Sequence, residues 1–339
     1  YLCQAVRITP TYVGAANGAP ASMVAKVPTF MEWPDRFMPL MTDMIHAEHC
    51  WYREEQPRFP ARAPQRFGSV FESREAHALR LEDCGALTHF SQTDACSAET
   101  AQLIVEHLAR AQAHWWEDPR LGELDWLPSV EQSVQRIEPI VQRAWDLFAQ
   151  RIVPRVDPAF VPIGERIVER FGDLLREGAA SASTLVHGDF RLKNVLMGER
   201  GGEDEVVILD WQLISHGSGL RDFAYFLGQN LEAETRRAAE PDLLDAYHAA
   251  LVAHGVRGYS RARCETDYRL GLLIAMWIPL LGTRGFEDVA EPAADAGEEA
   301  WESHRKVMDA GEALIAEMAS RNIETIMHAK AGELVGVPA

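Results

Sequence analysis

One short segment near the middle of the chain constrains the fold more than any other. It places Asp189 five residues before Asn194, and two short apolar runs at 195–197 and 206–209 follow before Asp210. Glycines separate the two runs, as in a small hairpin. The segment therefore predicts a tight loop that leads into a hairpin whose second strand ends at Asp210.

These three polar residues match the needs of phosphoryl transfer. That reaction uses a carboxylate to orient and deprotonate the acceptor hydroxyl, and oxygen ligands to hold Mg²⁺. Asp189 is the predicted base, and Asn194 and Asp210 are the predicted metal ligands. The alternative is a turn in which Asp189 and Asn194 only bond their own backbone, but it leaves an aspartate at the end of the next strand unexplained.

A known family carries the same pattern. The letters H-G-D-F-R-L-K-N at 187–194, with D-W at 210–211, resemble the H-G-D-x-x-x-x-N signature of the aminoglycoside phosphotransferase and choline kinase superfamily. The run D-W-Q at 210–212 and the run D-F-A-Y-F-L at 222–227 are closer to its ecdysteroid kinase-like branch.

The resemblance implies an α+β, two-lobed protein-kinase-like fold. A β-rich N-lobe at 1–84 would bind the nucleotide, and a mainly helical C-lobe at 85–339 would hold the catalytic loop and the acceptor site. ATP and Mg²⁺ are the implied cofactors, and the implied substrate is a small-molecule alcohol. An aminoglycoside or choline-type kinase remains an alternative within this superfamily.

The family pattern also requires a lysine on a strand and a glutamate on the following helix. Lys26 lies in an apolar strand, where an unpaired ammonium would be costly, and Glu48 opens a stretch similar to the family's E-x-x-F/W-Y helix. We expect these two residues to form an ion pair in the nucleotide cleft. Glu54 or Glu55 replaces Glu48 if the helix register is shifted.

The resemblance assigns further roles residue by residue. Glu82 and Cys84 lie in an L-x-L-E-D-like segment that joins the lobes, where backbone groups meet the adenine edge. His187 and Asp222 would buttress the catalytic loop, and a helix-dipole role is the plainer alternative for Asp222. Arg191 would neutralise transferred charge, or would be an ordinary exposed loop residue.

Periodicity predicts the order β-β-α-β-β followed by a largely helical region. The predicted strands and helix of the first part are residues 4–12, 22–27, 43–55, 66–71 and 77–81. Residues 97–177 are predicted to be helical, with Ser97 as an N-cap. A short run at 184–186 is apolar, and helices resume at about residue 220.

The glycine-rich loop that covers the phosphates in this family cannot be recognised in residues 1–6, and Gly14 and Gly18 come too late. Two explanations stay open. Either the chain is a fragment that lacks its first strand, as its non-methionine start favours, or the loop is degenerate and nucleotide binding is impaired. The second explanation keeps a pseudokinase or a nucleotide-dependent binding module as an alternative function.

Composition narrows the possible partners and the cellular location. The 33 basic and 51 acidic residues give a net charge of −18, which disfavours nucleic acid. The five cysteines lack CxxC spacing, which is typical of reduced thiols in the cytoplasm. The most apolar stretch, 271–282, is too short to span a membrane. Sequence does not indicate the oligomeric state.

A nearly uncharged stretch at 268–281 is the candidate wall of the acceptor site. Pockets for apolar ligands are lined mainly by such residues, with a few polar groups for orientation. Tyr268 and Trp277 are the side chains predicted to reach an apolar, sterol-like or lipid-like alcohol. The plainer alternative is that this stretch is ordinary core.

Overall fold

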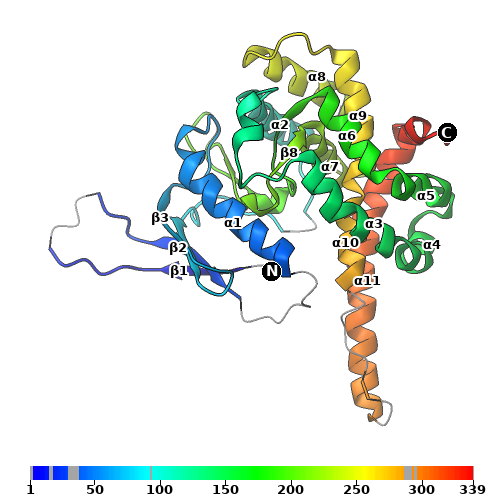
Figure 1. Ribbon diagram of the computed structural model, residues 1–339, viewed down its shortest axis with the longest axis horizontal. Helices are drawn as coiled ribbons and strands as arrows, with labels where there is room; N and C mark the ends of the chain where they lie inside the picture. The colour runs from blue at the N-terminus through cyan, green and yellow to red at the C-terminus, as the bar shows by residue number, and fades with distance from the viewer. Residues whose placement is uncertain are drawn as a thin grey trace.

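The computed structural model describes residues 3–14, 18–29, 38–91, 94–285, 292–293 and 296–338. A small lobe built on an antiparallel sheet lies beside a larger helical lobe, as Figure 1 shows. The expected α+β, two-lobed, protein-kinase-like fold is thus confirmed, with a β-rich small lobe and a mainly helical large lobe.

Four strands form the sheet of the small lobe, in the order β1-β2-β4-β3. They are β1 (Cys3–Ile8), β2 (Met23–Pro28), β3 (Arg66–Phe71) and β4 (His77–Glu82), and each neighbouring pair is antiparallel. Helix α1 (Met38–Glu54) packs against the sheet through β3. In the central strand β2, Lys26 lies opposite Leu79 of β4 and Ala5 of β1.

Two boundaries of the small lobe differ from the prediction. The first strand ends at Ile8 and not at residue 12, because Pro10 has no amide hydrogen to continue the ladder. Helix α1 begins at Met38, five residues before the predicted start. Pro39 is tolerated there because the amide groups of a first helical turn need no intrahelical partner.

The large lobe consists mainly of helices. They are α2 (Ala98–Ala113), α3 (Val130–Arg151), α4 (Val153–Val156), α5 (Val161–Glu169), α6 (Phe171–Ser181), α7 (Leu220–Asn230), α8 (Ala233–Ala253), α9 (Arg261–Ala275), α10 (Trp277–Arg284) and α11 (Glu298–His328). Ser97 caps α2 by accepting a hydrogen bond from the Thr100 amide, as predicted. Helix α7 is buried along its whole length and packs on α9, so it forms the centre of the core.

Two small hairpin-like pairs of strands lie where the lobes meet. The predicted pair is β6 (Val195–Met197) with β7 (Val206–Ile208), and it bridges to Thr88 and Arg62 outside the large lobe's helices. The second pair, β5 (Ser183–Val186) with β8 (Ser215–Ser218), was predicted only in its first strand. The sequence of β8 is Ser-His-Gly-Ser, which has little β propensity.

Figure 1 also shows that the N-terminal half of α11, in orange, projects away from the rest of the large lobe. Its buried residues accordingly begin at Glu312, in the second half of the helix. Among the described residues, no helix is long and apolar enough to cross a membrane.

Candidate active site

The predicted catalytic loop, residues 187–194, follows strand β5 and is held by a buried carboxylate. Asp222, at the start of α7, accepts hydrogen bonds from the backbone amides of His187 at 2.7 Å and Gly188 at 2.8 Å. Gly188 has a φ of +85°, and a Cβ there would lie 2.3 Å from the Leu213 carbonyl oxygen. The loop therefore needs glycine at this position.

The side chains of this loop converge on Asp189. Asn194 donates from Nδ2 to the Asp189 carbonyl oxygen at 2.8 Å and to its Oδ2 at 3.0 Å. The guanidinium of Arg191 lies 3.1 Å from the same Oδ2, so Arg191 is paired and not an exposed loop residue. With its nitrogen engaged, Asn194 leaves its amide oxygen available to a cation.

Lys26 joins the two lobes at the site. Its Nζ contacts Glu48 Oε1 at 2.6 Å and Oε2 at 2.8 Å, so the expected ion pair forms. The same ammonium lies 2.9 Å from Asp210 Oδ1. Asp210 has a left-handed backbone, with φ of 62°, which is uncommon outside glycine and marks a constrained turn.

Aromatic stacking fixes helix α1 against this turn. The rings of Trp51, on α1, and Trp211 are stacked, with centroids 4.0 Å apart and an angle of 14° between the planes. His187 also contacts Trp211, with ring centroids 4.8 Å apart, and its Nε2 donates to the Leu209 carbonyl oxygen. Glu48 lies about one helical turn before Trp51 on α1, so the stack holds its carboxylate within reach of Lys26.

Burial and neighbouring charges shift the pKa values of these groups in opposite directions. Burial raises the pKa of Asp189, and Arg191 only partly opposes the effect. Burial would also raise the pKa of Asp210, but Lys26 outweighs it and the pKa is lowered. Burial alone would lower the pKa of Lys26, yet Asp210 and Glu48 raise it. Asp210 therefore favours its ionised form, whereas Asp189 accepts a proton more readily.

A cavity of about 250 Å³ opens between the lobes at this cluster. Its lining includes Lys26, Glu48, Asn194 and Asp210, together with the lobe-joining residues Glu82 and Cys84. The Glu82 carboxylate is held by two 2.8 Å hydrogen bonds from the Arg62 guanidinium, and burial raises the pKa of the Cys84 thiol to about 12. The charge of Glu82 is thus neutralised by Arg62, and the Cys84 thiol is uncharged.

The two residues predicted to reach the acceptor lie in different surroundings. Trp277 begins α10 and lines a separate cavity with Gln212 and Leu213, which follow Asp210 closely. Tyr268 is buried in α9 against Phe223 of α7 and lines neither that cavity nor the one between the lobes. Most of the apolar stretch is therefore core, and within the described part of the chain Trp277, at the break between α9 and α10, is its residue that lines one of these two cavities.

Several supporting residues were not recognised in the sequence. Gln112 of α2 donates to Asp222 Oδ2 at 3.1 Å, and the Asn230 side chain accepts from the Leu192 amide at 3.1 Å. Tyr225 is buried beside Asp189 and Arg191, whose charges act on its hydroxyl. Tyr225 lies in the D-F-A-Y-F-L run that carries the family resemblance, and this run is the only sequence signal for it.

Comparison with known proteins gives one family match. The model of the ecdysteroid kinase-like family matches residues 71–257, which is more than half of the chain and includes the whole catalytic loop, the β6–β7 pair and α7. A comparison with curated proteins returned no significant match.

Solved structures with low sequence identity also align over most of the chain. Choline kinase from Cryptosporidium parvum is 10% identical, with 92% of this chain and 91% of that chain covered and a TM-score of 0.48. The macrolide 2'-phosphotransferase from Brachybacterium faecium is 18% identical, with coverage of 86% and 83% and a TM-score of 0.42. An aminoglycoside phosphotransferase from Streptomyces rimosus is 17% identical, with coverage of 77% and 86% and a TM-score of 0.41.

Proposed function

The chain belongs to the ecdysteroid kinase-like family, and we propose that it is an ATP-dependent kinase that transfers the γ-phosphate to a hydroxyl group of a small molecule. One observation carries the proposal. Lys26 lies between the carboxylates of Glu48 and Asp210, at 2.6 Å and 2.9 Å, in a cavity that Asn194 also lines. An ammonium held between two acids is poised to exchange one of them for a phosphate.

The reaction is an in-line transfer between two oxygens. The acceptor oxygen forms a bond to the γ-phosphorus, the bond from that phosphorus to the bridging oxygen of ADP breaks, and the hydroxyl proton passes to Asp189. The raised pKa of Asp189, caused by its burial, makes it a better proton acceptor than an exposed aspartate. Arg191, 3.1 Å from Asp189 Oδ2, supplies positive charge beside the transferred group.

The residues present also suit a magnesium ion. Asn194 engages its nitrogen with Asp189, and Asp210 engages Oδ1 with Lys26, so an amide oxygen and Oδ2 remain as hard ligands. Magnesium, when bound, would neutralise charge on the phosphate oxygens. We propose residues 1–84 as the nucleotide lobe and 85–339 as the lobe of the catalytic loop and acceptor, with the apolar body of an alcohol packed against Trp277.

The decisive test is phosphate transfer by the purified protein. Release of ADP from Mg·ATP should be stimulated by at least one member of an alcohol library, and the product should gain one phosphate by mass spectrometry. The variant Asp189→Asn serves as the matched inactive control, because it keeps the side-chain shape. Nucleotide binding without stimulation by any alcohol, and without background hydrolysis, would instead support a pseudokinase.

Lys26 gives a prediction for the nucleotide half of the site. The substitution Lys26→Met should weaken binding of Mg·ATP by about 10- to 100-fold, because a charged hydrogen bond to phosphate contributes roughly 1.5 to 3 kcal/mol. Glu48→Gln should weaken binding less, because Asp210 still positions the ammonium. Titration of a fluorescent ATP analogue measures both. Unchanged affinity in Lys26→Met would contradict this assignment.

A further inference from the structure

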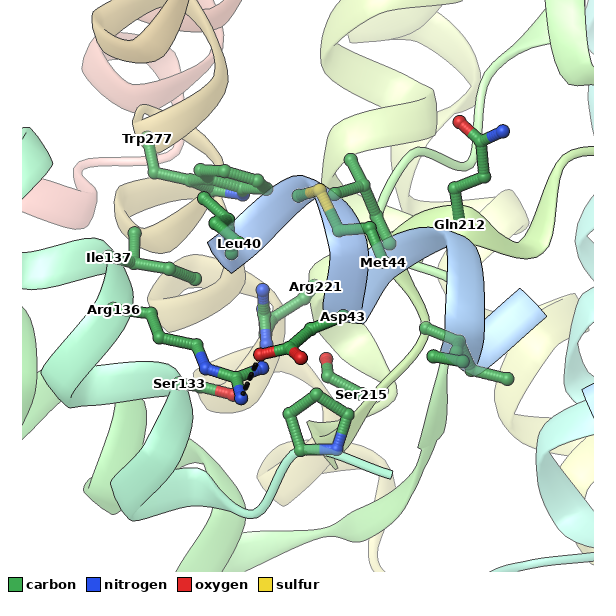
Figure 2. A pocket seen from close by; sticks show the side chains of 14 residues that line it. Leu40, Asp43, Met44, Ser133, Arg136, Ile137, Gln212, Ser215, Arg221 and Trp277 are labelled. Atoms are coloured by element: carbon green, nitrogen blue, oxygen red, sulfur yellow. Dashed lines mark hydrogen bonds and ion pairs between the residues drawn. The ribbon is translucent and has the colours of Figure 1, made fainter. Parts of the chain in front are cut away.

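A second cavity lies between α1 and the large lobe, next to the catalytic loop (Figure 2). It is small, about 50 Å³, which is room for a compact group but not for a whole sterol. Its apolar wall includes Leu40, Met44, Ala47, Ile137, Leu213 and Trp277. The wall is continuous with the catalytic loop, because the Leu213 carbonyl packs directly over Gly188.

One charged side chain inside this apolar wall has no partner. Arg221, the second residue of α7, is only 7% exposed and lines the cavity. Within the described part of the chain, its guanidinium makes no hydrogen bond and no ion pair. In the view of Figure 2 it lies between Trp277 above and Ser215 below. Ser133 and Ser215 add two hydroxyl groups to the same lining.

The neighbouring charged residues do not compensate the positive charge of Arg221 directly. Asp43 and Arg136 also line the cavity, but they pair with each other at 2.7 Å and cancel. Asp222 is next in sequence, yet both of its oxygens accept hydrogen bonds from the catalytic loop. Burial lowers the pKa of Arg221 and Asp222 opposes the change, but a guanidinium remains charged at neutral pH. The cavity therefore carries an uncompensated positive charge.

An unpaired buried charge is costly, and natural cores avoid it unless a ligand supplies the partner. We propose that Arg221 binds an anionic group, a carboxylate or sulfate, carried by the acceptor itself, so that the substrate is an acidic alcohol with an apolar body. The inference rests on the proposed kinase function and adds a substrate class to it. The acid group fills the small cavity beside Arg221, and the hydroxyl lies toward Asp189.

The same chemistry argues against cationic acceptors. An aminoglycoside or a choline-like alcohol would place positive charge beside Arg221, at a cost that no free carboxylate in the cavity's described lining offsets. A second source of anionic oxygens is the nucleotide phosphate itself. The experiment must therefore separate an acid on the acceptor from a phosphate on ATP.

The first arm measures binding without turnover. We compare ω-hydroxyhexanoate, hexanediol and ω-aminohexanol by calorimetry in the absence of nucleotide. The acid should bind about 10- to 100-fold more tightly than the diol, because a charge-assisted hydrogen bond contributes roughly 1.5 to 3 kcal/mol. The amine should bind worst. Arg221→Met should reduce the preference for the acid to about twofold or less, and the distant Arg305→Met should keep it.

The second arm measures the melting temperature. Replacing an arginine with a purely structural role would lower it, whereas replacing an unpaired one would not. Because Arg221 is unpaired, ligand-free Arg221→Met should melt at or above the wild-type temperature. The hydroxy acid should raise the melting temperature of the wild type but not of the variant. A variant that melts well below wild type would show a structural role and overturn the proposal, whatever its ligand binding.

The outcomes also separate this inference from the kinase function. If the wild type binds acid and diol equally, the acidic acceptor is wrong while transfer to alcohols can still stand. If Arg221→Met weakens Mg·ATP as much as it weakens the acid, Arg221 serves the nucleotide and the proposal fails. If hydroxy acids bind through Arg221 but none is phosphorylated while neutral alcohols are, the anion is not carried by the acceptor and the proposal fails, whereas the kinase function stands.

Discussion

Asp189→Asn should abolish phosphate transfer while leaving Mg·ATP bound. The amide can still accept the hydrogen bond from Asn194 Nδ2, which lies 3.0 Å from Asp189 Oδ2, so the loop keeps its shape. It cannot accept the acceptor proton, and a general base contributes about 10²- to 10⁴-fold to the rate. We expect kcat to fall within that range and the ATP dissociation constant to change by about threefold or less.

Asp210→Ala should behave differently, because Asp210 contacts Lys26 at 2.9 Å and offers a metal ligand. Both transfer and Mg·ATP affinity should fall. The exposed Asp309→Ala on α11 controls for loss of a carboxylate elsewhere. Equal losses of ATP affinity in Asp189→Asn and Asp210→Ala would refute the division between base and metal ligand.

A pH profile gives an independent check on the base. Asp189 must be deprotonated to accept a proton, and burial raises its pKa above the ordinary value of 3.8. Activity is therefore lost as pH falls through this raised pKa, and the acid limb of kcat/KM should lie above 3.8. An acid limb at or below that value would mean that another group accepts the proton.

The part of this site that the sequence predicts well is the part whose geometry is set by short spacing along the chain. The loop from His187 to Asn194 places its residues by short spacing, so the positions of Asp189 and Asn194 follow from the chain itself. The pairing of Lys26 with Glu48 is also predicted correctly, because a buried ammonium needs a counter-charge.

The remaining half depends on tertiary contacts that no spacing reveals. Gln112 lies 110 residues before Asp222, and its role exists only because α2 packs beside the start of α7. Arg221 shows the same limit: a single arginine before the family's aspartate gives no sign that it will be buried without a partner. The prediction for Tyr268 fails for a different reason, because apolar lining and apolar core have the same composition.

Asp222→Ala is expected to release the catalytic loop from its anchor and so to lower the stability of the protein. Asp222 is 1% exposed, so the substitution leaves the backbone amides of His187 and Gly188 without their acceptor in a buried site. It also removes one of the two acceptors of Gln112 Nε2, which keeps its bond to the Gly219 carbonyl oxygen. Unsatisfied buried donors cost about 1 to 3 kcal/mol each, and partial relaxation reduces the sum. The free energy of unfolding, measured in denaturant, should fall by about 3 to 5 kcal/mol.

The loss of activity should exceed what instability alone explains. At a temperature where the variant is still folded, transfer should fall more than about 100-fold, because Asp189 lies on the released loop and small displacements of a reacting group are costly. Binding of Mg·ATP should weaken less, since Lys26 and Glu48 lie in the other lobe. The exposed Asp242→Ala on α8 should match the wild type in all three measurements. A stable Asp222→Ala variant with wild-type turnover would mean that Asp222 only complements the helix dipole of α7, and that the loop is held by its own turn.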